Sequence, residues 1–331
     1  MEIRLLDLFS GIGGFHLGLE RAGFRVVESS FSEIDKYAIS VYQSHFKESI
    51  NVGSVTDIRG GADKFDAITF GSPCQDFSNA GVRRGLNGER SSLISHAIRL
   101  IAEIRPKFFI WENVKGTFTS NSGSDFWAII KAFTELGGYR LEWQLLNTAW
   151  FLPQNRERIY LVGLSGKIGG REIFPISEND RLSDNGKPRP LGIQTARCLR
   201  KNQHKAGRDD TYITYRIHEP TRKGYAEAEN GDSINVGRSK SKTRRGRVGK
   251  RSVGTLETEP TQAVVYSDKI RRLTPIETER LQGFPDNWTE YGIDGEKISD
   301  TQRYKMTGNA VTVPVVEAVG RRILQALEAP Q

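Results

Sequence analysis

Two stretches of the sequence decide the fold: residues 65–78, Phe-Asp-Ala-Ile-Thr-Phe-Gly-Ser-Pro-Cys-Gln-Asp-Phe-Ser, and residues 107–114, Lys-Phe-Phe-Ile-Trp-Glu-Asn-Val. Each is a short apolar run that passes into polar residues, which is typical of a strand leading into a loop. Cys74 follows the first run, and Glu112 ends the second. If both strands are parallel and end at the same edge of a sheet, the thiol and the carboxyl group share one crevice there.

This pair of side chains suits a particular chemistry. A thiolate is a good nucleophile towards an electron-poor ring carbon, and a neighbouring acid can protonate the ring nitrogen that takes up the charge. Methylation of cytosine at carbon 5 needs both groups, because that carbon has no nucleophilic lone pair of its own. A buried core thiol is the alternative reading of Cys74, but Pro73 before it and the polar Gln75 and Asp76 after it favour an exposed edge.

Short apolar runs alternate with helical periods over the first half of the chain. We predict strands at 3–8, 25–29, 66–70, 108–111, 141–146 and 159–162. Apolar residues at helical spacing predict helices around 37–42, 93–101 and 126–133, and a last helix at 313–327. The alternation indicates an α/β fold with a mainly parallel sheet and helices on both faces.

The pattern changes near residue 165, where the chain becomes polar and rich in Gly, Arg and Lys. Motif-like sequence returns at 271–288, so we interpret the polar region as an insertion. We predict a larger domain formed by 1–170 plus 301–331. We predict a small inserted domain at 171–300, which includes the 271–288 segment that packs it.

Composition limits the classes of function. The chain has 331 residues, of which 37% are hydrophobic, and it shows neither a run as long as a membrane span nor a signal peptide. Its two cysteines, Cys74 and Cys198, argue against a disulfide framework and for a reducing, cytoplasmic compartment. We take Cys198 as structural. The five histidines never pair with cysteine at metal-ligand spacing, so we expect no metal site.

The net charge of +8 is concentrated in one place. The stretch 238–251 carries eight Lys or Arg residues and no acid, which equals the whole excess. A lone basic run is usually a solvated loop, but beside a cytosine-methylation site it favours a nucleic-acid contact. We therefore expect Arg244, Arg245 and Arg247 to bind DNA.

A glycine loop, Gly11-Ile-Gly-Gly14, follows the first predicted strand and precedes a helix. Glycine lets the backbone approach a ligand closely. The spacing is not Gly-x-Gly-x-x-Gly, so the dinucleotide fingerprint fails. Glu33 lies near the end of the second strand, where a carboxylate can accept hydrogen bonds from both hydroxyls of a ribose.

These features, in this order, resemble the bacterial DNA (cytosine-5) methyltransferases nearly from end to end. The likeness covers the family's cofactor loop, nucleophile motif, acid motif, two-arginine motif, late structural motif and closing cofactor motif. The matching segments are, in the same order, 7–15, 71–78, 112–114, 154–158, 272–285 and 308–309.

The resemblance implies a Rossmann-like methyltransferase domain and a small target-recognition domain, with duplex DNA between them. Cys74 would attack carbon 6 of a cytosine flipped out of the helix, and Glu112 would protonate or hydrogen-bond N3. Arg158 would contact the cytosine carbonyl oxygen and Glu112. Arg156 would help order the nucleophile loop and contact a phosphate.

The resemblance also implies the binding residues. DNA would contact Ser78, Arg83, Arg84 and Thr255 besides the basic stretch, and the glycine-rich segment 81–88 would close over the substrate. We expect a monomer, with a cognate restriction endonuclease as a candidate partner. Phe9 and Ile34 would pack against the adenine of the cofactor. S-adenosylmethionine would be held by Phe9, Gly11, Ile12, Gly14, Glu33, Ile34, Val55, Pro73, Leu93, Asn309 and Ala310.

Two positions depart from the family pattern, both on the adenine side of the site. Ile34 stands where an aromatic residue is usual, and Ser54 stands where Asp is usual after Gly53. Three alternatives stay open: the same chemistry on transfer RNA, an inactive DNA-binding module, and a nucleotide-dependent oxidoreductase. The basic insertion favours duplex DNA, the presence of Cys74 and Glu112 disfavours an inactive module, and the glycine spacing disfavours an oxidoreductase.

Overall fold

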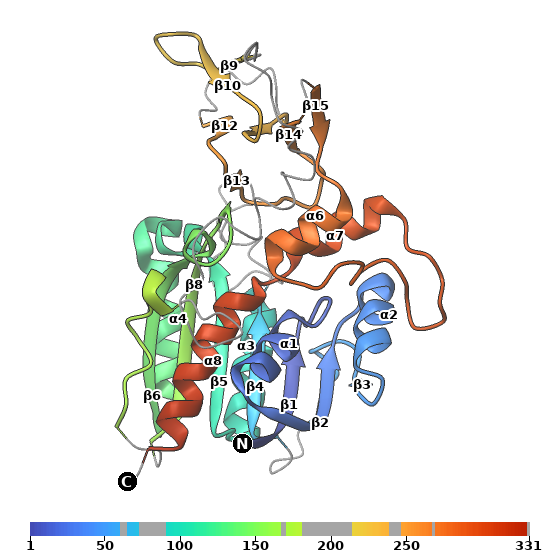
Figure 1. The fold of residues 1–331 in the computed structure, drawn as a ribbon. Helices are drawn as coiled ribbons and strands as arrows, with labels where there is room; N and C mark the ends of the chain where they lie inside the picture. Colours follow the sequence, from blue (N-terminus) through green and yellow to red (C-terminus); the bar gives the residue numbers. More distant parts are fainter. Residues whose placement is uncertain are drawn as a thin grey trace.

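A computed structural model of the chain describes residues 1–59, 65–72, 91–166, 170–180, 214–237, 246–266 and 269–329. A larger body holds a seven-stranded sheet, and a smaller body built of short strands stands above it (Figure 1). Helices α6 (Pro275–Gln282) and α7 (Asp300–Asn309) lie at one side between the two. In the described part of the chain no helix is long and apolar enough to cross a membrane.

The seven-stranded sheet has the order β3-β2-β1-β4-β5-β8-β6. The neighbours from β3 to β5 are parallel, whereas β8 runs antiparallel to both β5 and β6. The predicted, mainly parallel sheet is therefore confirmed. Its strands are β1 (Glu2–Leu8), β2 (Arg25–Ser32), β3 (Ile50–Asn51), β4 (Ala67–Gly71), β5 (Phe108–Val114), β6 (Tyr139–Asn147) and β8 (Glu157–Ser165).

Helices cover both faces of this sheet, and each face has its own apolar core. On one face the strands pack against α1 (Gly14–Ala22) and α8 (Val313–Leu327). On the other they pack against α3 (Ser91–Ile104) and α4 (Ser124–Glu135). A further helix, α2 (Lys36–His45), packs its Tyr42 ring on Phe31 of β2. The helices predicted from apolar spacing are all present, and the last one has the predicted bounds.

The contact between α1 and α8 depends on a small residue. A Cβ atom added at Gly18 of α1 would lie 2.5 Å from Cγ1 of Val316 in α8, so only glycine lets these helices approach so closely. The last helix thus returns to the first domain and supplies much of one core, including Val315, Val316, Val319 and Ile323.

The smaller body consists of two small antiparallel sheets. One is a hairpin of β9 (Tyr215–His218) and β10 (Tyr225–Ala228). The other has the order β12-β11-β14-β15. Its strands are β11 (Ser233–Asn235), β12 (Val248–Gly249), β14 (Gln262–Tyr266) and β15 (Lys269–Arg272). The two bodies are joined by parallel pairing of β13 (Val253–Gly254) with β7 (Gln154–Asn155), which precedes β8.

The segment 273–300, which we assigned to the inserted domain, contacts both bodies. Leu273 and Leu281 pack with Leu256 and Val264 of the smaller body. Further along, Trp288 packs in a core shared with Ile12 and Val41, and its Nε1–H donates to the carbonyl of Ile12 at 3.0 Å. This segment therefore forms the base on which the smaller body stands.

Candidate active site

The carboxyl ends of β4 and β5 and the amino end of the antiparallel strand β8 meet at Glu112. In the sheet register Glu112 lies opposite Gly71 of β4 on one side and Tyr160 of β8 on the other. Its side chain is mostly buried, with 9% of the residue exposed. A Cβ atom at Gly71 would lie 3.2 Å from Oε2 of Glu112, so the chain leaves β4 directly beside this carboxylate.

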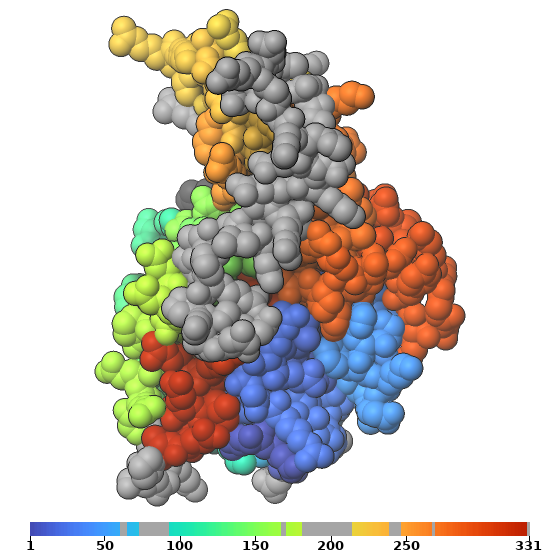
Figure 2. Space-filling view, in the orientation of Figure 1, coloured from blue at the N-terminus to red at the C-terminus, as the bar shows by residue number. Residues whose placement is uncertain are grey.

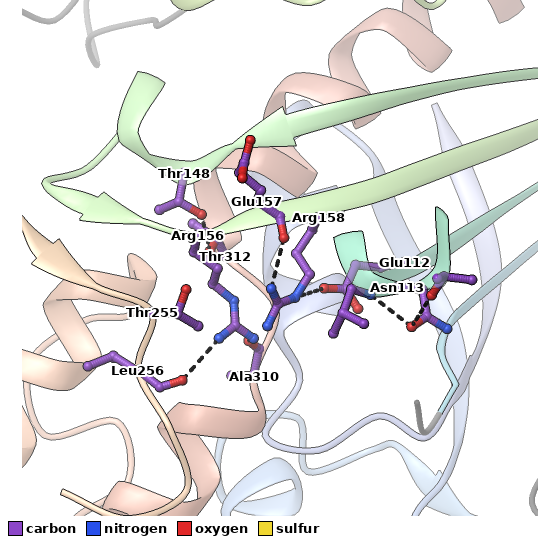
Figure 3. Close-up of polar contacts among 12 residues, drawn as sticks. Glu112, Asn113, Thr148, Arg156, Glu157, Arg158, Thr255, Leu256, Ala310 and Thr312 are labelled. Carbon is purple, nitrogen blue, oxygen red and sulfur yellow. Dashed lines mark hydrogen bonds and ion pairs between the residues drawn. The ribbon is translucent and has the colours of Figure 1, made fainter. Parts of the chain in front are cut away.

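Arg158 compensates the charge of Glu112. Its Nε lies 3.1 Å from Oε1 of Glu112, and both side chains are largely shielded from solvent (Figure 3). A buried carboxylate is costly without such a partner. A second donor of Arg158 is held by the carbonyl of Glu157 at 2.8 Å. Burial, and then the nearby Glu112, raise the pKa of Tyr160, so its hydroxyl stays protonated beside this pair.

Two residues that the sequence analysis did not single out orient the chain after β4. The hydroxyl of Ser72 accepts hydrogen bonds from Nε1 of Trp111 at 3.0 Å and from Nδ2 of Asn113 at 3.1 Å. Asn113 is buried and also accepts from the backbone N–H of Val114. Asn113 therefore fixes the residue that immediately precedes Pro73 and Cys74. Its place next to Glu112 was the available signal.

Arg156 corrects an expectation from the sequence. The two-residue spacing put Arg156 and Arg158 on one side of a strand, and Figure 3 shows both guanidinium groups below β8. Only 3% of Arg156 is exposed, however, and its donors reach the backbone carbonyls of Leu256, Gly308 and Ala310. The structure thus leaves it too deeply buried to contact a phosphate.

The glycine loop is tied to Glu33. One carboxylate oxygen of Glu33 accepts from the N–H of Gly11 at 3.0 Å, and the other accepts from those of Ile34 and Asp35. Within the described part of the chain, a Cβ built on Gly11 would meet no atom within 4 Å beyond its two chain neighbours, and Gly11 has a φ of +54°. An ionised carboxylate has about four acceptor positions, so Glu33 can bind the loop and still accept from a further donor.

Apart from Gly11 and Glu33, and from Pro73, which is not described, the predicted cofactor residues divide into three groups by exposure. Ile34 is 79% exposed, and Asn309 at the end of α7 is also exposed, so both are open to a ligand. Phe9 and Leu93 are partly buried against the core that contains Val55. The remaining members, Ile12, Gly14, Val55 and Ala310, are buried, and the structure gives them packing contacts rather than an open face.

Asp7 is a buried acid that the sequence analysis left without a role. It lies on β1 and is fully buried. Its Oδ1 accepts from Oγ1 of Thr69 at 2.7 Å, whereas Oδ2 has no hydrogen-bond partner among the residues that the structure describes. Burial, with a contribution from Glu33, raises the pKa of Asp7 well above 3.8 despite the bond from Thr69. The acid is thereby biased towards its protonated form behind the glycine loop.

The expected DNA contacts are only partly described. Arg247 is 3% exposed, and its backbone N–H donates to Glu219 at 2.6 Å, so the expectation that this side chain reaches DNA is wrong in this structure. Oγ1 of Thr255 donates to the carbonyl of Asn155 at 2.9 Å. The other predicted residues of the nucleophile loop and basic stretch lie outside the described residues: Pro73, Cys74, Ser78, Arg83, Arg84, Arg244 and Arg245. Cys198 lies outside them as well.

The β9–β10 hairpin presents basic and aromatic side chains that the sequence analysis overlooked. Arg216 and Lys223 both lie over the ring of Tyr225, at 4.7 and 4.6 Å from its centroid. Arg222 and Lys223 are exposed in the turn of the hairpin. Figure 2 shows this hairpin projecting from the top of the smaller body. The overlooked signal was the presence of Arg216, Arg222 and Lys223 between two tyrosines, Tyr215 and Tyr225.

Among the residues that the structure describes, no group of His, Cys, Asp or Glu side chains could hold a metal ion. The arrangement at Glu112 offers an acid and the guanidinium group of Arg158 at the end of a mainly parallel sheet. The glycine loop lies at the end of β1 in the same sheet, with β4 between it and β5.

Comparison with known proteins agrees with this geometry. The family model of C-5 cytosine-specific DNA methylases matches residues 3–325. The chain is 33% identical to the type II methyltransferase M1.ScrFI of Lactococcus lactis subsp. cremoris, over 99% of this chain and 79% of that protein. It is 31% identical to the type II methyltransferase M.NlaX of Neisseria lactamica, over 98% of this chain and 97% of that protein.

A solved structure shares the fold. A DNA modification methyltransferase encoded within an E. coli prophage superposes with a TM-score of 0.65 at 21% identity, covering 99% of this chain and 100% of that one. With a family model matched along nearly the whole sequence, the chain belongs to the C-5 cytosine-specific DNA methylases.

Proposed function

We propose that this protein transfers a methyl group from S-adenosylmethionine to carbon 5 of a cytosine that is flipped out of duplex DNA, with Cys74 as the nucleophile. The observation that carries this proposal is the register of Gly71 opposite Glu112. Cys74 is three residues beyond Gly71, so covalent geometry keeps its Cα within about 11 Å of that of Gly71. A thiol and a carboxyl group at adjacent strand ends are what the reaction needs.

The reaction follows from these side chains. The thiolate of Cys74 adds to carbon 6, and Glu112 protonates or hydrogen-bonds N3, which makes carbon 5 nucleophilic. Arg158 keeps Glu112 in place and has donors that suit the cytosine carbonyl oxygen. Carbon 5 then takes the methyl group, and loss of its proton expels Cys74. The target base has to leave the helix stack to reach both groups.

The residues around the glycine loop fit S-adenosylmethionine, which supplies an electrophilic methyl group when bound. Gly11 leaves room for a close approach, and Glu33 carries acceptors that suit the ribose hydroxyls. The exposed side chain of Ile34 offers an apolar surface for adenine. In the same region Ser54 bonds to Thr56 at 2.8 Å, so its hydroxyl already has a partner.

The names of the relatives support a role in DNA modification. M1.ScrFI and M.NlaX are named type II methyltransferases, and we propose that this protein protects a short DNA sequence in the same way. A restriction endonuclease that cuts the same sequence is the partner that this role implies. We propose that the enzyme acts as a monomer, because both the acid and the glycine loop belong to one sheet.

The nucleophile assignment is tested with duplex DNA in which 5-fluorocytosine replaces cytosine, because fluorine cannot leave carbon 5 as a proton does. The wild type is expected to form a covalent adduct with this DNA in the presence of S-adenosylmethionine. Cys74→Ser is expected to form none, and Cys198→Ser, the matched control, is expected to form as much as the wild type. An adduct on Cys74→Ser would assign the nucleophile elsewhere.

A further inference from the structure

Three chain segments that are far apart in the sequence meet at the guanidinium of Arg156. Nη1 donates to the carbonyls of Leu256 at 3.4 Å and Gly308 at 3.2 Å, and Nη2 donates to that of Ala310 at 2.9 Å (Figure 3). Leu256 belongs to the smaller body, and the other two flank Asn309 of the predicted cofactor motif. Burial lowers the pKa of Arg156 to about 9, which leaves it charged at neutral pH.

The segments also touch without the help of Arg156. A Cβ atom at Gly308 would lie 2.3 Å from the carbonyl oxygen of Glu257 and 2.6 Å from its carbonyl carbon. These are backbone atoms, so they cannot move aside as the end of a flexible side chain would. The residue before Asn309 is therefore pressed directly on the backbone of the smaller body.

Gln154 fastens the smaller body to the same place. Its Nε2 donates to the carbonyl of Leu281 at 2.8 Å, and its Oε1 accepts from the N–H of Leu256 at 3.2 Å. Next to it, Val253 and Gly254 pair with Gln154 and Asn155 in the short parallel ladder of β13 and β7. A displacement of residues 253–257 would thus change the contacts of both Arg156 and Gly308.

We propose that Arg156, Leu256, Gly308 and Ala310 form a joint that couples DNA binding by the smaller body to cofactor binding at Asn309. Arg156 is a positioning residue in this proposal and touches neither DNA nor cytosine. Its neighbour Arg158 holds Glu112, so the joint also adjoins the catalytic acid. The inference rests on the proposed function, because it requires that the smaller body binds DNA and that Asn309 faces the cofactor.

Coupling of this kind is reciprocal: if DNA tightens cofactor binding, the cofactor tightens DNA binding by the same factor. The test measures the affinity of S-adenosylhomocysteine, the non-reactive product of the cofactor, by calorimetry. The titrations are done with and without a DNA duplex that contains the sequence on which the enzyme acts. For the wild type we expect DNA to tighten binding by about fivefold or more. The ratio of the two dissociation constants is the readout.

Two variants disturb the joint in different ways. Arg156→Lys replaces a planar fork by a single ammonium group that cannot span three carbonyls, and Gly308→Ala pushes residues 308 and 257 apart. Both are expected to bring the ratio close to one. Arg303→Lys is the matched control, because Arg303 is equally buried but pairs with Glu279 and Thr289 instead. It is expected to keep the wild-type ratio.

The outcomes separate the joint from the chemistry. A folded Arg156→Lys that keeps the wild-type ratio would overturn the proposal, and so would a wild type whose ratio is one. If Arg156→Lys fails to fold, the ratio of dissociation constants measured for Gly308→Ala tests the proposal instead, and a wild-type ratio would overturn it. A wild type that transfers no methyl group to any DNA would instead overturn the proposed function. Loss of the ratio in Arg303→Lys as well would show a general effect of destabilisation and would overturn the joint.

Discussion

At the scale of single residues, Glu33 has two tasks that compete for one carboxylate. It holds the N–H groups of Gly11, Ile34 and Asp35, and we propose that it also binds the cofactor ribose. Glu33→Ala is therefore expected to weaken S-adenosylmethionine binding by about 1.5–3 kcal/mol, the value of a hydrogen bond to a charged group. Glu33→Gln, which keeps one acceptor, is expected to lose less. Calorimetry measures both, and an unchanged affinity in Glu33→Ala would remove Glu33 from the site.

Asp7 makes a prediction about stability and pH. Because burial raises the pKa of Asp7, the folded protein binds this proton more tightly than the unfolded chain does. The free energy of unfolding then falls as the pH rises from about 4 through the raised pKa in the folded state. Asp7→Asn lacks this titration, so its stability relative to the wild type is expected to increase over the same range. Urea titrations at several pH values measure it.

Asp66 is a control for Asp7, because the pKa of Asp66 is shifted in the opposite direction. Burial raises the pKa of Asp66, but hydrogen bonds from Arg4 and Lys107 lower it by more. The pKa of Asp66 therefore lies below 3.8. Its contribution to stability is present above the pKa of the unfolded chain and is lost as the pH falls through the lowered pKa. Asp66→Asn is thus expected to lose stability at neutral pH. If the stability of Asp7→Asn and of Asp66→Asn, each relative to the wild type, changed with pH in the same direction, the opposite pKa shifts of Asp7 and Asp66 would be contradicted.

The sequence was informative about residues whose partners follow from strand order. Cys74 and Glu112 were expected at neighbouring strand ends, and the described part of that site places Gly71 opposite Glu112. Arg156 was misjudged because its partners are carbonyls from 100 to 154 positions away in the chain. Backbone carbonyls carry no signature in the sequence, so no motif could reveal that contact.

At the scale of elements, most strands of the main sheet were predicted where they occur, but several extend further than predicted, and the two-residue strand β3 was not predicted. The strand predicted at 25–29 extends to Ser32, because Ser30 and Ser32 are buried although they are polar. The hydroxyl of Ser32 donates to the carbonyl of Gly53 at 2.7 Å, which satisfies it inside the core. Likewise, β5 continues past Trp111 because Arg158 and Ser72 satisfy Glu112 and Asn113. The pattern of apolar residues does not predict that a strand continues through polar residues, even when their side chains find hydrogen-bond partners in the fold.

We expect the β9–β10 hairpin to contact DNA in place of Arg247. Arg222 and Lys223 are exposed in its turn. Basic side chains bind phosphates, and each neutralised phosphate adds about 0.9 to the slope of log affinity against log salt. Replacing both by Ala is expected to weaken DNA binding and to lower the slope of log affinity against log salt by up to about two units. Fluorescence anisotropy over a range of salt concentrations measures the slope.

Arg25 and Lys107 provide the matched control for the hairpin. Both are exposed at the amino ends of their strands, opposite the end that carries Glu112, and their replacement removes the same charge. This variant is expected to keep the wild-type slope. Equal slopes for the hairpin variant and the wild type would move the DNA contact to another part of the smaller body.

At the scale of the whole molecule, the sequence predicts an inserted region but not the strands inside it. Its described strands are two to five residues long, which is too short for an alternating pattern to emerge. The pairing of β13 with β7 joins residues separated by about a hundred positions, and it leaves no local signal. The segment 273–300 carried motif-like sequence, but only the contacts of Leu281 and Trp288 show that it serves both bodies.

The return of α8 to the first domain has a consequence for how the protein is made. Domains commonly fold from the amino terminus while the ribosome is still at work, but here one core needs Val315, Val319 and Ile323, which are synthesised after the whole inserted region. The face of the sheet that α1 and α8 share therefore stays partly uncovered until residue 327 has left the ribosome. We expect a nascent chain that lacks α8 to expose this apolar surface to chaperones and proteases.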